Sequence, residues 1–176
     1  LVKINNFSIL EMQIKHLISF GFKDFIWICH FMSELFVEER KKLIEKYKDS
    51  IDSITIFVEK VPLSTFGSLK SSIEYASHID HVESNPSYLV LYGDILIGVD
   101  FYRFVENFKL YKKSDIHVLT RFSNHPEDSD KELLDSNGYI KKFISKNEPF
   151  SPTHPITTTT GIYLAKKSFF EKLSNW

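Results

Sequence analysis

The chain has 176 residues, of which 43% are apolar and 26% are charged, and its formal net charge is −1. This balance is typical of a globular domain with a substantial core, and it excludes both a disordered chain and a strongly basic nucleic-acid binder. Because no apolar stretch approaches the roughly 18–20 residues that span a membrane, and no signal peptide begins the chain, we expect a cytoplasmic protein with no membrane and no nucleic-acid partner.

Two hydrophobic periodicities alternate along most of the chain. Apolar residues three and four apart predict amphipathic helices, and short apolar runs predict buried strands. The expected elements are, in chain order, a helix over 8–21, a strand over 24–30, a helix over 33–48, a strand over 53–60, a helix over 66–78, a strand over 87–100, a helix over 100–113 and a strand over 115–121. Ser8 with Glu11, Ser33 and Asp100 are the expected helix caps.

This alternation predicts the fold class. Strands that alternate with helices of about 10 to 15 residues imply crossover connections and a mostly parallel sheet covered on both faces. We therefore expect a Rossmann-like three-layer α/β fold. The single cysteine, Cys29, lies in an apolar run and is expected to be buried and inert.

The pattern changes after residue 121. Two short strand-like runs flank Asn137-Gly138 and predict a hairpin insertion near residues 132–144. A proline-rich loop, a β-rich run of threonines and a short helix from Ser168 complete the chain. Because no repeat or linker divides the sequence, we expect a single domain over residues 1–176.

Asp94 interrupts the most apolar stretch of the chain, SYLVLYGDILIGVD. At the carboxyl end of a strand in an open α/β sheet, a carboxylate faces the crevice where ligands bind. A hard oxygen ligand there suits Mg²⁺, which keeps several waters and shares its shell with substrate phosphates. Gly93 allows the backbone to approach a ligand closely. The alternative is an ordinary turn aspartate.

Three other segments carry weaker signals. The stretch EKVPLSTFGSLK places a small-residue loop before a helix start, which favours phosphates, but it lacks the P-loop pattern and also fits an ordinary turn. Lys146 and the Thr159–Gly161 corner offer a cation and small polar groups over the sheet. The HPEDSD stretch at 125–130 contains metal-ligand residue types, although its proline and acidic run favour an exposed turn.

Five segments in one order resemble the sugar-phosphate nucleotidyltransferases, also called nucleotide-sugar pyrophosphorylases. The segments are LVKINNFSILEMQIKHLISFGFKDFIWI, EKVPLSTFGSLK, LVLYGDILIGVD, GYIKKFISK and TTGIYLA. Their counterparts in the family are a Pro-Leu-x-x-Ile start with a helix, E-x-x-x-L-G-T-A-G-A-L, a strand ending in G-D, a hairpin closing with F-x-E-K-P, and N-A-G-I-Y. The HPEDSD turn and the hairpin look most like the heptose-1-phosphate guanylyltransferase branch.

The resemblance implies a reaction and a site. A nucleoside triphosphate and a sugar 1-phosphate would give a nucleotide-sugar and pyrophosphate, with Mg²⁺ as cofactor. Asp94 would be the catalytic, metal-binding aspartate, and Lys146 the catalytic lysine that contacts the sugar phosphate. Nucleotide contacts would come from Glu59, Leu63, Ser64, Thr65, Gly67 and Gly93, and sugar contacts from Thr159, Thr160 and Gly161.

The chain also departs from the family pattern. The G-G-x-G-T-R loop that grips the triphosphate and a second metal-binding aspartate have no counterpart within residues 1–176, so we expect a domain incomplete at both ends and inactive as given. Ser64 replaces a glycine, Ser145 a glutamate and Thr159 an asparagine. Because of these substitutions, the hypothesis that the chain is a non-catalytic sugar-nucleotide-binding or regulatory relative of the family stays open. A protein-interaction domain is a third hypothesis. Sixteen phenylalanines leave room for a homo-oligomeric interface.

Overall fold

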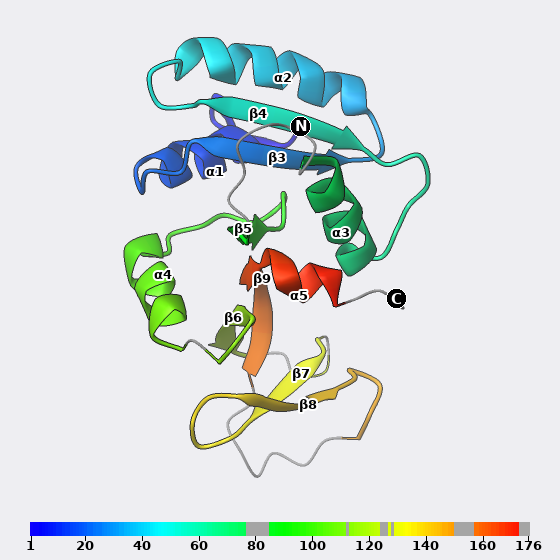
Figure 1. Ribbon diagram of the computed structural model, residues 1–176. Helices are drawn as coiled ribbons and strands as arrows, with labels where there is room; N and C mark the ends of the chain where they lie inside the picture. The colour runs from blue at the N-terminus through cyan, green and yellow to red at the C-terminus, as the bar shows by residue number, and fades with distance from the viewer. Residues whose placement is uncertain (77–84, 112, 124–126, 128, 150–156, 173–176) are drawn as a thin grey trace.

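The computed structural model describes residues 1–76, 85–111, 113–123, 127, 129–149 and 157–172 (Figure 1). Its elements are, in chain order, β1 (Lys3–Ile4), β2 (Phe7–Ser8), α1 (Ile9–Ile18), β3 (Asp24–Cys29), α2 (Ser33–Lys46), β4 (Ser53–Val58), α3 (Thr65–Ala76), β5 (Ser87–Leu91), α4 (Phe101–Leu110), β6 (Ile116–Phe122), β7 (Lys131–Leu134), β8 (Ile140–Ile144), β9 (Thr157–Lys166) and α5 (Lys167–Glu171). The helices and strands expected from the sequence are present, and the small β1–β2 hairpin is an addition to them. The strand expected over 87–100 is shorter than predicted: it ends at Leu91, because Gly93 and Asp94 form a turn and residues 95–100 form a connection that pairs with no described strand.

The strand order corrects one part of the predicted fold. β3 and β4 are parallel, as a crossover connection requires. β9 lies between β5 and β6 and runs antiparallel to both, so these two strands point the same way without pairing with each other. Among the described pairs β3 with β4 is the only parallel one, and the expectation of a mostly parallel sheet is wrong for them. The cause is that β9 follows the hairpin rather than a crossover helix, and it returns between two strands already laid down.

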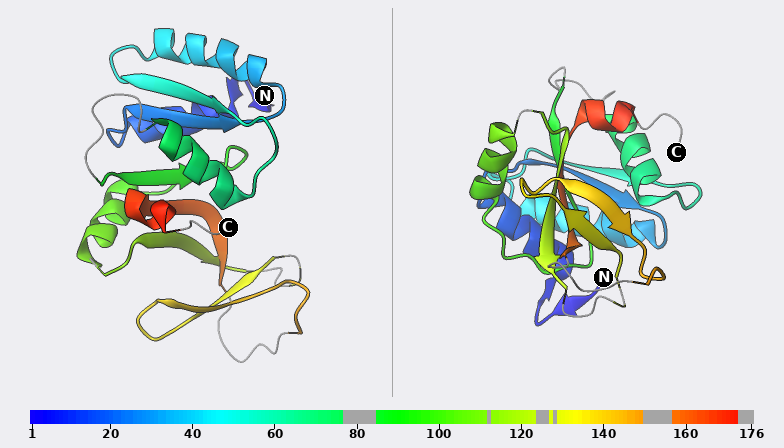
Figure 2. Two further views of the ribbon diagram at one scale, coloured as in Figure 1. Left: turned by 45° about the vertical axis from the view of Figure 1, so that its right-hand side comes forward. Right: turned by 90° about the horizontal axis from the view of Figure 1, so that it is seen from below.

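The three-layer α/β architecture is confirmed. Alternate residues of β5 pack into different cores: Leu89 and Leu91 against the cluster of α1, α2, β3 and α4, and Tyr88 and Val90 against the cluster of α3 and α5. The view from below shows α1 and α4 on one side of the strands and α3 and α5 on the other (Figure 2). Because β5 packs against a hydrophobic cluster on each face, its sequence is continuously apolar rather than alternating.

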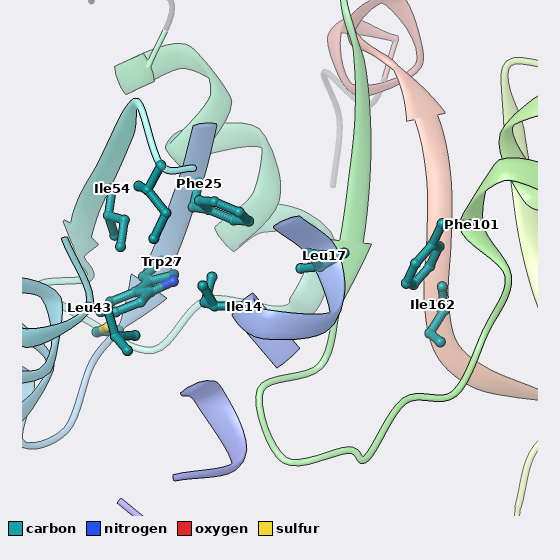
Figure 3. Close-up of a cluster of buried hydrophobic side chains, with 10 residues drawn as sticks. Ile14, Leu17, Phe25, Trp27, Leu43, Ile54, Phe101 and Ile162 are labelled. Carbon is teal, nitrogen blue, oxygen red and sulfur yellow. The ribbon is translucent and has the colours of Figure 1, made fainter. Parts of the chain in front are cut away.

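Helix α1 fills the larger core. Its Ile14 and Leu17 lie between the side chains of β3 and the buried pair Phe101 and Ile162 (Figure 3). The pair β3–β4 and the sheet of β5 and β9 share this core without hydrogen bonds between β3 and β5 in the described residues. Cys29 belongs to the same cluster, and burial raises the pKa of its thiol to about 11, as expected of an inert cysteine.

Local capping signals are mostly confirmed. The Ser8 hydroxyl accepts a hydrogen bond from the backbone N–H of Glu11, and the Asp100 carboxylate accepts one from that of Arg103. The prediction of Ser33 as a cap is wrong, because α2 is preceded by Met32 in the left-handed region (φ 54°) and Ser33 is already helical. No helix in the described part of the chain is long and apolar enough to cross a membrane.

The hairpin of β7 and β8 projects beyond the end of the sheet, with Asn137-Gly138 at its turn (Figure 1). Gly138 adopts φ +82°, a conformation that glycine takes without strain. β7 is joined to β9 through the register pair Glu132 and Thr157. The hairpin is thereby anchored beside the first residues of β9.

Candidate functional site

Asp94 lies in a turn directly after β5, and two elements hold that turn. From α1, the Gln13 side-chain amide donates to the carbonyl oxygens of Tyr92 and Ile95 at 2.8 Å each. From β9, the Gly161 carbonyl accepts the Tyr92 N–H at 3.1 Å. The Asp94 side chain is exposed, and within the described residues its carboxylate forms neither a hydrogen bond nor an ion pair. The strand exit therefore presents a carboxylate that is available to a ligand.

A bulge in β9 lies against this turn. Leu119 is opposite Ile162 and Thr120 is opposite Thr159, so two residues of β9 fall outside the register. One of them is Gly161, with φ +78°, and a Cβ added there would come within 2.8 Å of the Tyr92 ring. Glycine is required here both by the backbone conformation and by the close approach of Tyr92. Bulges of this kind commonly lie beside active sites, where they redirect a side chain.

Three hydroxyl groups meet at the bulge. Thr159 Oγ1 donates to Tyr163 Oη at 3.2 Å and accepts from the Gly161 N–H at 3.1 Å. The hydroxyls of Tyr92 and Tyr163 are 3.5 Å apart. Burial raises the pKa of Tyr163 to about 12, so its phenol remains neutral and can donate a hydrogen bond. We call the group of Tyr92, Thr159, Gly161 and Tyr163 the hydroxyl corner.

The start of α3 reaches the same corner through an aromatic contact. The Phe66 ring lies 6.4 Å from that of Tyr163, centroid to centroid. Ahead of it, Leu63, Ser64 and Thr65 are exposed. Tyr163 therefore contacts Tyr92, the residue directly after β5 and just before the Asp94 turn, and Phe66, in the first turn of α3. That the segments carrying Asp94, Thr159 and Gly67 form one ligand site stays a prediction.

Three of the predicted nucleotide contacts, Glu59, Ser64 and Gly67, also organise the loop before α3 and its first turn. The Ser64 hydroxyl accepts the Gly67 N–H at 3.3 Å and so caps α3. The Glu59 carboxylate accepts a hydrogen bond from the Ser68 hydroxyl one turn into the helix. A Cβ on Gly67 would lie 3.2 Å from the Ser64 oxygen, so glycine allows this close fold of the loop.

Lys146 is connected to the corner through the backbone. Its N–H donates to the Asp130 carboxylate at 2.9 Å, and the Asp130 carbonyl accepts from the Thr158 hydroxyl at 3.0 Å, one residue before Thr159. The Lys146 side chain itself is exposed. By contrast, the Thr160 hydroxyl donates to the Leu119 carbonyl at 2.7 Å and is engaged within the sheet.

Glu132 is a buried acid beside the corner that the sequence analysis did not select. It is 4% exposed, and its Oε2 is buried without a hydrogen-bond partner. Burial raises the pKa of its carboxyl, while hydrogen bonds from the Thr157 side chain and the Thr159 backbone act in the opposite direction. The Thr157 hydroxyl donates to the Glu132 main-chain carbonyl at 3.3 Å, so β7 is joined to β9 just ahead of the bulge.

This burial predicts a pH-dependent stability. Because the pKa of Glu132 is higher in the folded than in the unfolded state, its contribution is complete below the ordinary value of 4.5 and is lost as the pH rises through the folded pKa. The isosteric variant Glu132→Gln removes this loss. We expect the free energy of unfolding of the variant, measured by urea titration, to rise relative to that of the unmodified protein as the pH increases from about 4 to about 8. A constant difference across this range would contradict the prediction.

A hollow lies beside α1 and the segment that follows Asp94. Its volume is about 550 Å³, and it is lined by Phe7, Glu11, Met12, Gln13, Lys15, His16, Ser19, Leu96 and Ile97. None of the predicted site residues lines it. The HPEDSD turn lies partly outside the described residues, and among the described ones no group of three or more histidine, cysteine, aspartate or glutamate side chains could hold a metal.

The family is decided by comparison with known proteins. A family model described as Nucleotidyl transferase matches residues 1–175. The chain belongs to the nucleotidyl transferase family. A comparison with curated proteins gave no match. Among the solved structures, HddC from Yersinia pseudotuberculosis, solved in complex with GMP-PN, matches with a TM-score of 0.66 at 16% identity. The match covers 95% of this chain and 66% of the HddC chain, so this nucleotidyl transferase chain spans somewhat less than two thirds of its neighbour.

Besides Glu132, three residues of this candidate site in the nucleotidyl transferase chain were not predicted from the sequence: Gln13, Tyr92 and Tyr163. Tyr163 could have been found, because it follows Thr159 and Gly161 at a spacing of two along a strand. Tyr92 directly precedes the predicted Gly93-Asp94 pair. Gln13 carries no such signal, since its role depends on a contact with residues 79 and 82 positions away.

Proposed function

We propose that the complete gene product joins a nucleoside triphosphate to a sugar 1-phosphate and releases pyrophosphate. The observation that best supports this is the hydroxyl corner, where Tyr92, two residues before Asp94, and Phe66, in the first turn of α3, contact β9 at its bulge. Such a reaction depends on positioning and charge neutralisation. It needs one group of residues for the metal ion and phosphates, a second for the base and a third for the sugar hydroxyls.

The chemistry of Asp94 fits Mg²⁺, and members of this family generally use a divalent metal ion. A single exposed carboxylate suits a cation that takes its remaining ligands from water and phosphate oxygens. When bound, Mg²⁺ would neutralise charge on the nucleotide phosphates. A structural zinc site would require several clustered ligands, which the described residues do not supply.

The remaining roles follow from position. A phosphate oxygen of the sugar 1-phosphate would attack the α-phosphorus in line, and the bond to the β-phosphate would break with pyrophosphate as leaving group. Lys146 would supply positive charge to the incoming phosphate. The loop of Glu59, Leu63, Ser64, Thr65 and Gly67 would surround the base, with Gly93 beside the phosphates. The sugar would be contacted at Thr159 and Gly161, with Thr160 supporting the bulge.

Guanosine triphosphate and heptose 1-phosphates are the first substrates to test. HddC has the same fold and was solved with GMP-PN. The HPEDSD turn and the hairpin resemble the heptose-1-phosphate guanylyltransferase branch. The hairpin pairs with β9 through Glu132 and Thr157, two residues before Thr159, and Lys146 follows its second strand, so we expect sugar choice to depend on the hairpin.

A substrate panel tests this proposal. The complete gene product, with Mg²⁺, is given four nucleoside triphosphates crossed with a set of sugar 1-phosphates, and pyrophosphate release is measured. We expect release that requires both substrates. Calorimetric binding of a nucleotide or nucleotide-sugar without release in any combination would favour the non-catalytic relative instead. Neither binding nor release would contradict both hypotheses.

A further inference from the structure

Gln13 makes an unusual pair of contacts for a helix residue. It is 5% exposed, and its Nε2 donates to the carbonyl oxygens of Tyr92 and Ile95, both at 2.8 Å. These carbonyls stand immediately before Gly93 and immediately after Asp94. One buried side chain of α1 therefore closes the turn that carries the exposed carboxylate.

The chemistry of these contacts requires a primary amide. The NH₂ group has two N–H donors and can serve both carbonyls at once. An apolar side chain of the same length would leave both oxygens without a donor, and a carboxylate would place negative charge against two carbonyl oxygens. The contacts bridge about eighty residues of sequence and join α1 directly to the Asp94 turn.

We propose that Gln13 is a positioning residue for Asp94, setting the turn in the geometry in which the carboxylate receives a metal ion. The inference rests on the proposed function, because it assumes that Asp94 is the metal ligand. Residues that orient a metal ligand typically change metal affinity 10- to 100-fold when they are replaced. The effect should thus appear in metal binding itself as well as in turnover.

The chain offers a matched control on the same helix. His16 lies one turn after Gln13, and its Nε2 is 2.9 Å from the Val99 carbonyl, five residues beyond Asp94. Its ring also packs edge-on against Phe20 and Phe101. Replacing His16 removes a comparable contact between α1 and the same connecting segment without touching the Asp94 turn.

The experiment compares Gln13→Met with His16→Leu in the complete gene product. Calorimetry measures Mg²⁺ binding to the protein saturated with a non-hydrolysable GTP analogue, and kinetics give the apparent Mg²⁺ constant separately from kcat. We expect Gln13→Met to weaken Mg²⁺ binding about 10- to 100-fold, and His16→Leu to change it less than about twofold while lowering the melting temperature. Gln13→Asn, which keeps the amide on a shorter stem, should be intermediate and decides the question if the methionine variant does not fold.

The Asp94→Ala variant distinguishes failure of the proposed metal site from failure of the positioning role of Gln13. If it leaves Mg²⁺ binding unchanged, the proposed metal site is wrong whatever Gln13 does. If it abolishes binding while the Gln13 variants bind Mg²⁺ like the unmodified protein, the positioning role alone is overturned. Equal weakening by the Gln13 and His16 variants would likewise overturn it, because it would indicate a general loss of packing around α1.

Discussion

Asp94→Asn is expected to lower kcat/KM for pyrophosphate release by roughly 10²–10³-fold, the range found when one preorganised electrostatic group of an active site is lost. The substitution keeps the size of the side chain and removes its charge. Because Asp94 is exposed and its carboxylate has no partner among the described residues, the folded state should lose little stability. Steady-state assays of the complete gene product at several Mg²⁺ concentrations provide the measurement.

Asp100→Asn is the matched control for this substitution. Asp100 is also exposed and lies six residues further along the same segment, where it caps α4. Asparagine caps helices about as well as aspartate, so both stability and turnover should remain within about twofold of the unmodified protein. If the Asp94 and Asp100 variants are equally active, the proposed role of Asp94 in the reaction is wrong.

Gly161→Ala is expected to lower the free energy of unfolding by about 2–4 kcal/mol. Two costs add: a side chain in the left-handed region at φ +78°, and a Cβ that would lie 2.8 Å from Cδ2 and 2.9 Å from Cγ of Tyr92. The ring of Tyr92 must move, and it carries the hydroxyl corner with it. Urea unfolding measures the stability, and calorimetry with a nucleotide-sugar measures the site.

Gly138→Ala is the control that measures the cost of a side chain at positive φ without a steric contact such as that with Tyr92. Gly138 has a similar φ of +82°, but a Cβ there would meet nothing within 4 Å. It should cost about 1–2 kcal/mol, from the backbone alone. In a Tyr92→Ala background Gly161→Ala should become milder and approach the cost of Gly138→Ala, because the two ring contacts at 2.8 and 2.9 Å are gone and only the Cβ of residue 92, at 3.3 Å, remains. An undiminished cost in that background would contradict the close packing of Tyr92 on Gly161.

The parts of the fold that depend on neighbouring residues could be predicted. The caps at Ser8 and Asp100 and the hairpin turn at Asn137-Gly138 follow from residue types at short spacing. Hydrophobic periodicity predicted the helices and strands because it, too, depends only on residues close together in the sequence. The insertion of β9 between β5 and β6 could not be predicted, because strand order depends on packing between segments far apart in the chain.

The same division applies to the candidate site. Asp94 was found because a charged residue interrupts an apolar strand, which is visible locally. Tyr92 and Tyr163 act through a contact across 71 residues, which depends on the strand order. Buried Glu132 is similar: an acid in a short strand normally faces solvent, and its burial depends on the pairing of β7 with β9.

The most direct test is a crystal structure of the complete gene product with Mg²⁺ and a non-hydrolysable nucleoside triphosphate. We expect the metal ion within about 2.1 Å of an Asp94 carboxylate oxygen, as Mg²⁺ coordination requires. The base should lie against the loop from Glu59 to Gly67, and the phosphates should point toward the hydroxyl corner. A nucleotide bound instead in the hollow between α1 and Leu96, with Asp94 turned to solvent, would contradict the proposed site.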